Sequence, residues 1–442
     1  AVMVDNLDAP IFVGTFHQFC LNVLKEKSSL ELPADFRIAS EEDVADVVRN
    51  LWPEAGAKER NQKLLTISKW KSVDFKTPEP EDVKIYTQDL RRRGWLDFDD
   101  LQLETLKILE SGAGVLNDLR KTYPAIFVDE YQDINAVQHA LLRQLAGPQN
   151  RITAIGDPNQ AIYGFRGSDV RFFETFTEDF SPSEVFHLSD NYRSAKNLLS
   201  ASGQVMSAGG NANIPELTAN IYAQGRLIIH AVPTEKAEAE YVVHQIEKLV
   251  GGTSMFSQDT GRVETEEEGE RTFGDIAILY RLNSQRYALQ KALDRSGIPY
   301  NVTVKKTDSS LEEDWQGQYS KADEGAVVDS EKVSLMTLHA SKGLEFPVVF
   351  IVGCENQLLP LNAGGMISDI EEERRLFYVG MTRAKERLYM IRAKQRMLYG
   401  QKAQHDPSPF LADIEEGLKE YEKIVSMSKS RKKSDLQFDL FQ

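Results

Sequence analysis

The chain has 442 residues, of which 41% are hydrophobic, and a formal net charge of −16. This length allows two or three domains with buried cores, and no apolar run approaches the roughly 20 residues of a membrane span. The only cysteines are Cys20 and Cys354 and no signal peptide is recognised, so no disulfide framework is implied and a reducing cytoplasm is predicted. The acidic balance argues against a broadly basic nucleic-acid surface, although a single-strand channel needs only local charge and aromatic side chains.

The N-terminal quarter combines a short motif with a helical region. Residues 14–17 read Gly-Thr-Phe-His. From residue 19 to about residue 109, apolar residues recur at helical spacing between Pro and Gly breaks, as Val44, Val47 and Val48 do. This pattern predicts a helical subdomain.

An apolar run at residues 125–128 follows Pro124 and ends in Asp129 and Glu130. The run is typical of a fully buried strand in a parallel sheet, and ligands of such sheets lie beyond the carboxyl ends of the strands. Asp129 and Glu130 are then placed to hold Mg²⁺, and Glu130 also to orient and deprotonate an attacking water. The alternative is an ordinary acidic turn, and this stretch alone leaves both interpretations open.

A second apolar run, at residues 152–155, ends in a polar loop that reads Gly-Asp-Pro-Asn-Gln-Ala-Ile-Tyr-Gly-Phe-Arg-Gly. Three more blocks follow: Leu-Ser-Asp-Asn-Tyr-Arg-Ser from residue 188, Thr-Leu-His-Ala-Ser-Lys-Gly-Leu-Glu-Phe from residue 337, and Glu-Arg-Arg-Leu-Phe-Tyr-Val-Gly-Met-Thr-Arg-Ala-Lys from residue 373. Strands and helices alternate from residue 126 to about residue 199, which predicts a βαβ core. Strands at 226–232 and 276–280 are predicted to begin a second α/β unit that ends near residue 399.

These five blocks, in this order, resemble motifs II to VI of the UvrD/Rep-type superfamily 1 DNA helicases, and residues 14–17 resemble the Thr-Phe-His motif that precedes motif II. The resemblance extends from about residue 13 to about residue 399. It implies an α/β fold with two RecA-like parallel-sheet motor domains and an inserted helical subdomain. The expected ranges are 1–17 and 96–220 for the first motor domain, 18–95 for the helical subdomain, 221–400 for the second motor domain and 401–442 for a tail.

The sequence departs from the family in two places. An adenine-reading Gln motif and a phosphate-cradling Gly-x-Gly-Lys-Thr loop are both lacking, so we expect a truncated polypeptide, or less readily a protein that has lost hydrolysis. Residues 302–332 form a polar, acidic linker where the family inserts a 2B subdomain. Because the phosphate-cradling loop is lacking, we expect this chain alone to be inactive in hydrolysis.

By the same resemblance, the ATP site draws on both motor domains. Gln160 is expected beside the γ-phosphate and the attacking water, Tyr192 on the adenine, and Arg193 on the γ-phosphate. Glu345 is expected near the ribose hydroxyls, with an exposed acid as the alternative. Arg383 is the candidate arginine finger, which would make hydrolysis depend on domain closure. The catalytic set is Glu130, Gln160 and Arg383, and the ATP-binding set is Asp129, Gln160, Tyr192, Arg193, Glu345 and Arg383.

The DNA strand is expected to meet stacking and polar side chains. Aromatic rings bind any base and contribute roughly 1–3 kcal/mol each. By family match Phe165 stacks on a base, Thr15 and Phe16 line the strand, and His339 contacts its backbone or couples it to ATP. For Phe16 and Tyr163 ordinary core packing is the alternative. The complete DNA-binding set is Thr15, Phe16, His17, Tyr163, Phe165, Arg166 and His339.

The resemblance implies an ATP- and Mg²⁺-dependent DNA helicase that translocates 3′ to 5′ along single strands and unwinds single-strand/duplex junctions in DNA repair or replication. A helicase–nuclease subunit and a non-hydrolysing DNA- or clamp-binding scaffold are the alternatives. The C-terminal residues Gln437, Phe438, Leu440 and Phe441 resemble peptides that dock on the bacterial sliding clamp. A frayed amphiphilic tail is the other interpretation of this end.

Overall fold

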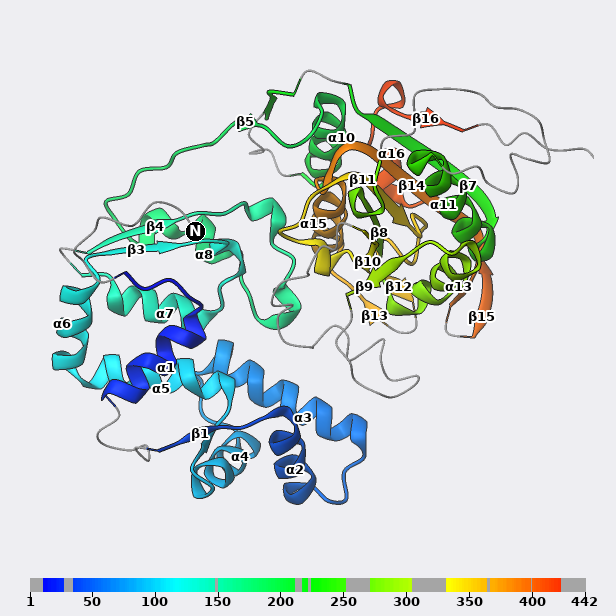
Figure 1. Cartoon of the computed structure of the whole chain (residues 1–442). Coiled ribbons are helices and arrows are strands. Elements are labelled where there is room, and N and C mark those ends of the chain that lie inside the picture. Colours follow the sequence, from blue (N-terminus) through cyan, green and yellow to red (C-terminus); the bar gives the residue numbers. More distant parts are fainter. Residues whose placement is uncertain are drawn as a thin grey trace, which may run out of the picture.

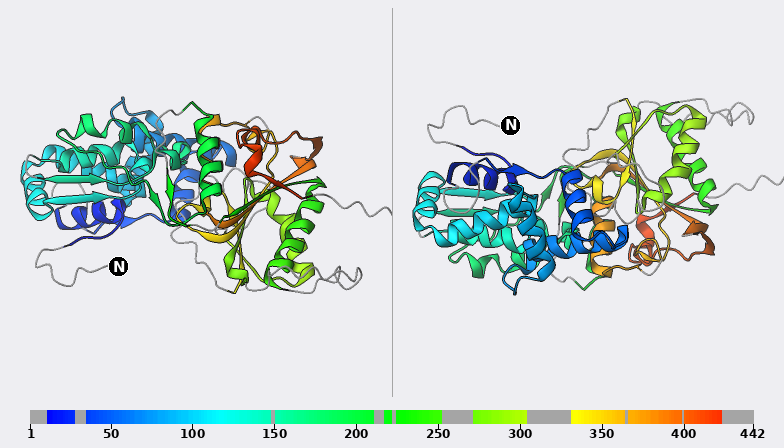
Figure 2. Two further views of the ribbon diagram at one scale, coloured as in Figure 1. Left: turned by 90° about the horizontal axis from the view of Figure 1, so that it is seen from above. Right: turned by 90° about the horizontal axis from the view of Figure 1, so that it is seen from below.

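The computed structural model describes residues 11–27, 35–147, 150–210, 217–221, 224–251, 271–303, 331–363, 366–398 and 400–422. Two α/β lobes lie side by side, and a group of helices lies against the first lobe (Figures 1 and 2). Most of the predicted linker, residues 304–330, and the predicted clamp-binding residues Gln437, Leu440 and Phe441 fall outside the described ranges. None of the described helices is long and apolar enough to cross a membrane.

The first lobe is built on two parallel strands, β3 (Ala125–Val128) and β4 (Arg151–Ala154), paired in register from Ala125 opposite Arg151. Both strands occur where the apolar runs predict them. The prediction that the first run is fully buried is wrong, because Phe127 is 72% exposed and only Val128 is buried. One face of the pair packs on helices, among them the short Phe-rich helices at residues 171–179, while Phe127 points from the other face.

Helices complete this lobe on the packed side. They are α1 (Phe16–Lys27), α5 (Phe98–Ser111), α6 (Ala113–Thr122), α7 (Ala136–Leu145), α8 (Arg171–Glu174) and α9 (Phe176–Asp179). Cys20 and Leu24 of α1 share a core with Leu101 of α5 and Leu141 of α7. The predicted boundary at residue 18 therefore divides a helix that packs as part of the first lobe.

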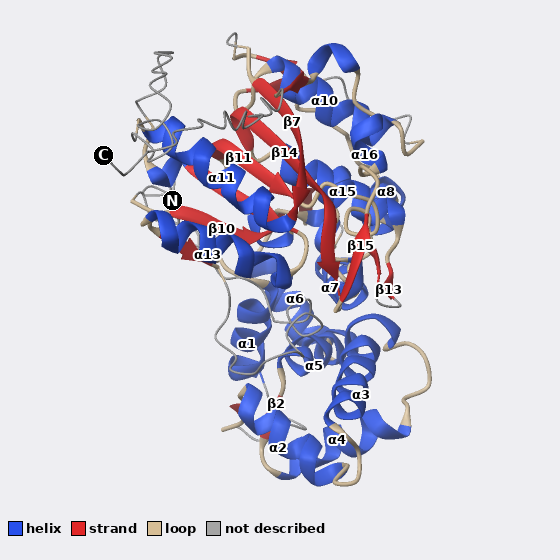
Figure 3. Ribbon diagram, turned by 90° about the vertical axis from the view of Figure 1, so that its right-hand side faces the viewer, coloured by secondary structure: helices blue, strands red, loops and turns tan. Residues whose placement is uncertain are grey.

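The helical subdomain contains α2 (Glu41–Leu51), α3 (Ala57–Lys69), a π-helical turn (Trp70–Asp74) and α4 (Glu81–Arg92), and a short parallel pair, β1 (Arg37–Ile38) and β2 (Trp95–Leu96), closes it. The Ser40 hydroxyl accepts a hydrogen bond from the Asp43 N–H and caps α2. Val47 and Val48 point into its core, as their spacing predicts. In Figure 3 these helices lie at the end of the molecule opposite the large sheet.

The second lobe contains an eight-stranded sheet in the order β16–β7–β14–β11–β8–β10–β9, with β15 pairing antiparallel to β14 and the other pairs parallel. The strands at residues 226–232 and 276–280 confirm their predictions. The bounds are β7 (Arg226–Thr234), β8 (Ile276–Tyr280), β9 (Tyr300–Val302), β10 (Val333–Thr337), β11 (Phe346–Val352), β14 (Ala384–Leu398), β15 (Gln401–Gln404) and β16 (Glu420–Tyr421). The predicted boundary at residue 400 thus falls within the sheet, because β15 and β16 belong to it.

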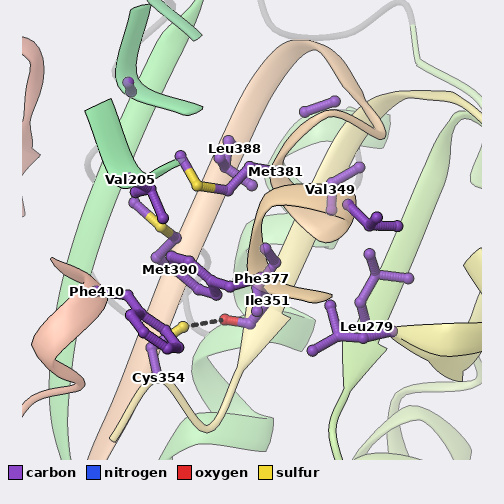
Figure 4. Close-up of a cluster of buried hydrophobic side chains, with 14 of the residues drawn as sticks. Val205, Leu279, Val349, Ile351, Cys354, Phe377, Met381, Leu388, Met390 and Phe410 are labelled. Atoms are coloured by element: carbon purple, nitrogen blue, oxygen red, sulfur yellow. Dashed lines mark hydrogen bonds between the residues drawn. The ribbon is translucent and has the colours of Figure 1, made fainter. Parts of the chain in front are cut away.

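Helices cover both faces of this sheet. α10 (Lys196–Ser207), α15 (Ile370–Met381) and α16 (Pro409–Ala412) cover one face, and α11 (Glu235–Val250) and α13 (Arg286–Ser296) cover the other. Successive side chains of a strand alternate between the faces, so Val349 and Ile351 join the first core (Figure 4) and Phe350 joins the second. The predicted range 96–220 puts α10 in the first lobe, but its apolar face packs in the second.

The remaining described elements are short. They are the pairs β5 (Asp190–Asn191) with β6 (Thr218–Ala219) and β12 (Asn362–Ala363) with β13 (Met366–Ile367), and 3₁₀ turns at Tyr131–Asp133, Pro158–Gln160, Gly164–Arg166, Phe273–Asp275, Asn283–Gln285, His339–Ser341 and Glu416–Leu418. Four of these turns, at residues 131–133, 158–160, 164–166 and 339–341, lie between the lobes and carry candidate site residues.

Candidate functional site

The carboxylates predicted at the end of β3 lie on an exposed turn. Glu130 adopts the left-handed backbone conformation (φ 52°, ψ 42°), and its N–H donates to Asp129 Oδ1 at 3.0 Å. Gln132 Nε2 donates to Glu130 Oε2. A left-handed non-glycine residue is uncommon and often marks a functional turn. Here the left-handed conformation of Glu130 turns the chain at the end of β3, and the side chains of Asp129 and Glu130 are exposed.

The end of β4 lies beside this turn. Gly156 allows the Gln132 side chain to lie close to the backbone after β4, because a Cβ added to Gly156 would come within 2.1 Å of Gln132 Oε1. Gln132 Oε1 also accepts from the Asp157 N–H at 3.1 Å. Asp157 caps the 3₁₀ turn that follows and accepts a hydrogen bond from Gln160 Nε2 at 2.9 Å. The two strand ends thus fix the Gln160 amide close to the Glu130 turn.

Arg383 reaches this amide from the second lobe. Arg383 is 1% exposed, and its guanidinium donates hydrogen bonds to the carbonyl oxygens of Val379 at 2.9 Å and Leu344 at 3.0 Å. Nη2 donates to Gln160 Oε1 at 3.1 Å. Burial, with the nearby Arg193 guanidinium second, lowers the pKa of Arg383 to about 10. The group still carries its charge at neutral pH, and that charge lies at the lobe interface.

A second cation crosses the interface beside Arg383, and its role is missed by the sequence analysis. Lys342 follows the 3₁₀ turn after β10, and its side chain is 7% exposed. Its ammonium group pairs with Asp133, donates to the Gln160 carbonyl oxygen at 2.7 Å and lies 3.5 Å from Glu130 Oε2. Burial raises the pKa of Asp133 to about 6, and Lys342 acts in the opposite direction. The lysine lies within the block at residues 337–346, which is the signal that marks it.

The rim of the interface carries the remaining predicted nucleotide-site residues. Tyr192 is 74% exposed. Arg193 Nε donates to Glu345 Oε2 at 2.5 Å, and Lys385 Nζ pairs with Glu345 Oε1 at 2.5 Å. These hydrogen bonds, with that from Lys385 the stronger, lower the pKa of Glu345. Arg193 and Glu345 thus form an ion pair at the rim, and Lys385 is an additional cation there with no predicted role.

The predicted DNA-binding residues separate into two groups. In the first group, the Phe165 ring meets the His339 ring edge to face, with centroids 5.4 Å apart, and lies 6.2 Å from the Tyr163 ring. The Arg166 guanidinium lies over the Tyr163 ring at 5.0 Å and over the Phe165 ring at 5.5 Å, measured to the ring centroids. Burial, then the positive charges of two arginines, lowers the pKa of His339 far below its ordinary value, so the ring is neutral. A neutral imidazole favours stacking over pairing with a phosphate.

The second group lies at the start of α1. Thr15 Oγ1 accepts from the Gln18 N–H at 3.2 Å, and His17 is hydrogen-bonded to Gln102 at 2.6 Å. Phe16 packs against the core around Val128, which supports the core-packing alternative for this residue. Tyr163 is also partly buried, against the second-lobe core.

The donor set fits Mg²⁺ bound together with a substrate phosphate. Mg²⁺ is usually held by one or two carboxylates, with waters and phosphate oxygens completing its octahedron. Asp129 and Glu130 supply two exposed carboxylates, and no cluster of three or more His, Cys, Asp or Glu side chains suited to a metal occurs in the described ranges. These two residues would hold the ion together with phosphate oxygens of a bound nucleotide.

Acids and an amide that follow strands of the first lobe therefore face buried cations of the second lobe. Such an arrangement is typical of two-domain proteins that bind a nucleotide between their domains. Comparisons with known proteins identify the family. The UvrD/REP helicase N-terminal domain matches residues 6–181, and the UvrD-like helicase C-terminal domain matches residues 186–308 and 316–395. The chain belongs to the UvrD/REP helicase family, and its two lobes are RecA-like motor folds.

Curated relatives resemble most of the chain. The ATP-dependent DNA helicase PcrA of Staphylococcus epidermidis is 24% identical over 92% of this chain and 76% of its own length. The ATP-dependent DNA helicase UvrD1 of Mycobacterium leprae is 25% identical over 93% of this chain and 76% of its own length. A solved C-terminal domain of a possible DNA helicase from a Lactobacillus matches 53% of this chain and 99% of its own, with 17% identity and a TM-score of 0.30.

Proposed function

We propose that the protein is an ATP-dependent single-stranded DNA translocase and helicase that moves 3′ to 5′ and acts in DNA repair or replication. The observation that carries this proposal is the hydrogen bond between Gln160 of the first lobe and Arg383 of the second. It joins a strand-end amide to a buried guanidinium across the lobe interface. A nucleotide bound there would be held by both lobes, so hydrolysis would change how the lobes are held together.

In this proposal the chain's residues divide the work on ATP. Asp129 and Glu130 would hold Mg²⁺, which would supply positive charge to neutralise the phosphates. Glu130 accepts a proton from the attacking water, and Gln160 orients that water. Arg193 and Arg383 bind the γ-phosphate, since guanidinium groups match phosphate oxygens. Tyr192, exposed on the rim, stacks on the adenine, and Glu345 binds the ribose hydroxyls.

The strand is proposed to run over the aromatic group formed by Tyr163, Phe165 and His339, with Arg166 beside it. Lys342 supports a connection between this group and the nucleotide site, because its ammonium lies 5.3 Å over the Tyr163 ring while it also contacts Gln160 and Asp133. Thr15 and His17 are proposed to contact the strand farther along, while Phe16 packs in the core around Val128. Coupled changes at the two sites would move the protein along one strand.

The test is ATP turnover by the 442-residue chain, measured with and without single-stranded DNA, beside Glu130→Gln and Arg383→Ala. A version extended at its N-terminus by a Gly-x-Gly-Lys-Thr segment is assayed beside the 442-residue chain, and the proposal expects strand-stimulated turnover in that extended version. Glu130→Gln in the extended version should lose at least about 100-fold in turnover with ATP binding kept, because general-base catalysis contributes 10²–10⁴-fold. Undiminished turnover in Glu130→Gln would remove it from the base role. The sequence lacks a Gly-x-Gly-Lys-Thr loop, so the parent assay also decides whether these 442 residues suffice for hydrolysis.

A sliding clamp is proposed as a further partner, on the strength of Gln437, Leu440 and Phe441 in the C-terminal sequence. Apolar side chains next to a polar, basic stretch could fill a pocket on the clamp while the stretch acts as a tether. A pull-down with purified clamp should capture the parent protein but not the Leu440→Ala/Phe441→Ala double variant. Equal capture of the double variant and the parent would dispose of this partner.

A further inference from the structure

The loop at residues 161–166 follows β4 in the first lobe but packs on the second. We call it the aromatic loop, because it carries Tyr163 and Phe165. Ile162, at its start, is fully buried in the second-lobe core that includes Leu376 and Phe377 of α15. A side chain from one lobe thus completes the hydrophobic core of the other. Withdrawing it would expose its whole apolar surface and leave a cavity.

Helix α15 also holds the backbone of the aromatic loop at two points. Arg375 Nε donates to the Ala161 carbonyl oxygen at 2.9 Å. The Gly164 N–H donates to Glu372 Oε1 at 3.0 Å. Both are charge-assisted hydrogen bonds, which are stronger than neutral ones. They lie on either side of Ile162 and Tyr163, so the loop is fixed to α15 before and after its buried anchor.

The position of the Glu372 carboxylate also restricts residue 164. A Cβ added to Gly164 would lie 3.2 Å from each Glu372 carboxylate oxygen. The close approach of backbone and carboxylate therefore suits a glycine. At the far side of the loop, the Tyr163 hydroxyl lies 3.5 Å from the His339 carbonyl oxygen, and Phe165 meets the His339 ring. His339 itself belongs to the second lobe.

From these contacts we infer that Ile162, Glu372 and Arg375 are positioning residues that fasten the aromatic loop to the second lobe, so that Tyr163, Phe165 and His339 form one base-stacking platform. The inference rests on the proposed function, because it assigns a cause to the platform's geometry. None of the three positioning residues needs to touch the strand. When the lobes move apart, the platform would stay with the second lobe and the chain between β4 and Ile162 would take up the movement.

The first experiment tests the fastening without DNA. Hydrogen–deuterium exchange of the 442-residue chain is compared for the parent, Ile162→Ala, Glu372→Ala and Arg375→Ala. Peptides covering residues 161–167 should exchange faster in each variant, while peptides of β8 and β11 keep their protection. Glu371→Ala is the matched control, since it removes the same charge from the same helix turn. The Glu371 carboxylate pairs with Arg374, which also belongs to the second lobe. Parent-like exchange of the loop in all three variants would overturn the fastening.

The second experiment tests the consequence for the strand. Affinity for a labelled oligothymidylate is measured over a range of salt concentrations. Each of the three variants should lose roughly tenfold in affinity, about 1.4 kcal/mol, with an unchanged salt slope, because no phosphate contact is removed. Glu372→Gln should keep most of the affinity, since its amide oxygen can accept the Gly164 N–H. Parent-like affinity in variants whose loop exchanges faster would overturn the positioning role.

A third experiment separates fastening of the loop from a general loss of stability. Gly164→Ala pushes against Glu372, so it should weaken strand binding in the parent. It should have a smaller effect in the Glu372→Ala background, where the obstructing carboxylate is gone. Additive losses would contradict direct contact between the two residues. If the parent itself binds no single strand, the proposed function fails, and the exchange experiment still decides whether the loop is fastened.

Discussion

The sheets of the two lobes are made from similar apolar strands, yet they are buried to very different extents. In the second lobe every residue of β8 is buried, because helices cover both faces of an eight-stranded sheet. In the first lobe β3 pairs only with β4 among the described strands, and Phe127 is 72% exposed. Burial of a strand is therefore decided by what packs on it, and the apolar run alone does not determine it.

The largest expected effect tests this difference directly. Phe350 is fully buried in β11 and stacks on Tyr389 with ring centroids 4.5 Å apart. Phe350→Ala should lower the free energy of unfolding by about 3–5 kcal/mol, the usual cost of removing a core phenylalanine. Phe127→Ala should change it by no more than about 0.5 kcal/mol. Urea denaturation followed by circular dichroism measures both, and equal losses would show that Phe127 is buried in solution.

A smaller loss is expected from the ionic cluster that joins the helical subdomain to the first lobe. Lys71 is 1% exposed, and its ammonium lies 2.9 Å from Asp97 Oδ2 and 2.7 Å from Asp100 Oδ1. Lys71→Met removes the cation that pairs with Asp97, while Asp100 keeps its ion pair with Arg91 at 3.0 Å. The expected cost is about 3 kcal/mol, at the low end for a broken buried pair. The low end applies because burial raises the pKa of Asp97 to about 6, so that a proton can replace the lost charge.

The same Lys71→Met variant has a matched surface control. Arg226 and Glu420 pair at 2.9 Å with both side chains more than 40% exposed, so Arg226→Met should cost less than about 1 kcal/mol. Denaturation of both variants at neutral pH gives the comparison. A loss from Lys71→Met no larger than that from Arg226→Met would mean that the helical subdomain does not depend on this cluster.

A local effect is expected where the lobes meet. Burial raises the pKa of Asp133, and the Lys342 ammonium opposes that rise. Lys342→Met removes the opposing charge, so the pKa of Asp133 should move further upward from about 6. Carbon-detected NMR titration of the labelled carboxyl group measures it, with Lys385→Met, which removes a cation from the rim, as the control. An unchanged Asp133 titration in Lys342→Met would show that the lobes are not closed in solution.

The sequence predicts local structure in this chain better than it predicts partnership between distant segments. Apolar runs locate β3, β4, β7 and β8, and helical spacing locates α2, because each pattern lies within one element. The family resemblance brings Gln160 and Arg383 to one site, and the structure joins them by a hydrogen bond. Their roles in ATP chemistry remain predictions.

Contacts between elements far apart in the chain could not be predicted in the same way. Lys342 lies 209 residues from Asp133, and Glu372 lies 208 residues from Gly164. Nothing in the local pattern of either residue specifies a partner in the other lobe. Helix α10 illustrates the same point, since its amphipathic pattern predicts one buried face but not which sheet that face will cover.

The smallest expected effect concerns pH and the first lobe alone. His139 in α7 stacks on Phe172 with ring centroids 4.3 Å apart, and burial, as the largest cause, lowers its pKa below the ordinary 6.5. The unfolded chain then binds more protons than the folded chain at pH values just below 6.5. The free energy of unfolding should therefore rise with pH through that window, and the contribution of His139 to it should be lost as the pH falls. His139→Gln should reduce this slope, seen as a smaller difference between urea midpoints at about pH 5.5 and about pH 7.5. An unaltered slope would mean that the nearby Asp179 carboxylate, 3.4 Å from Nε2, offsets the burial.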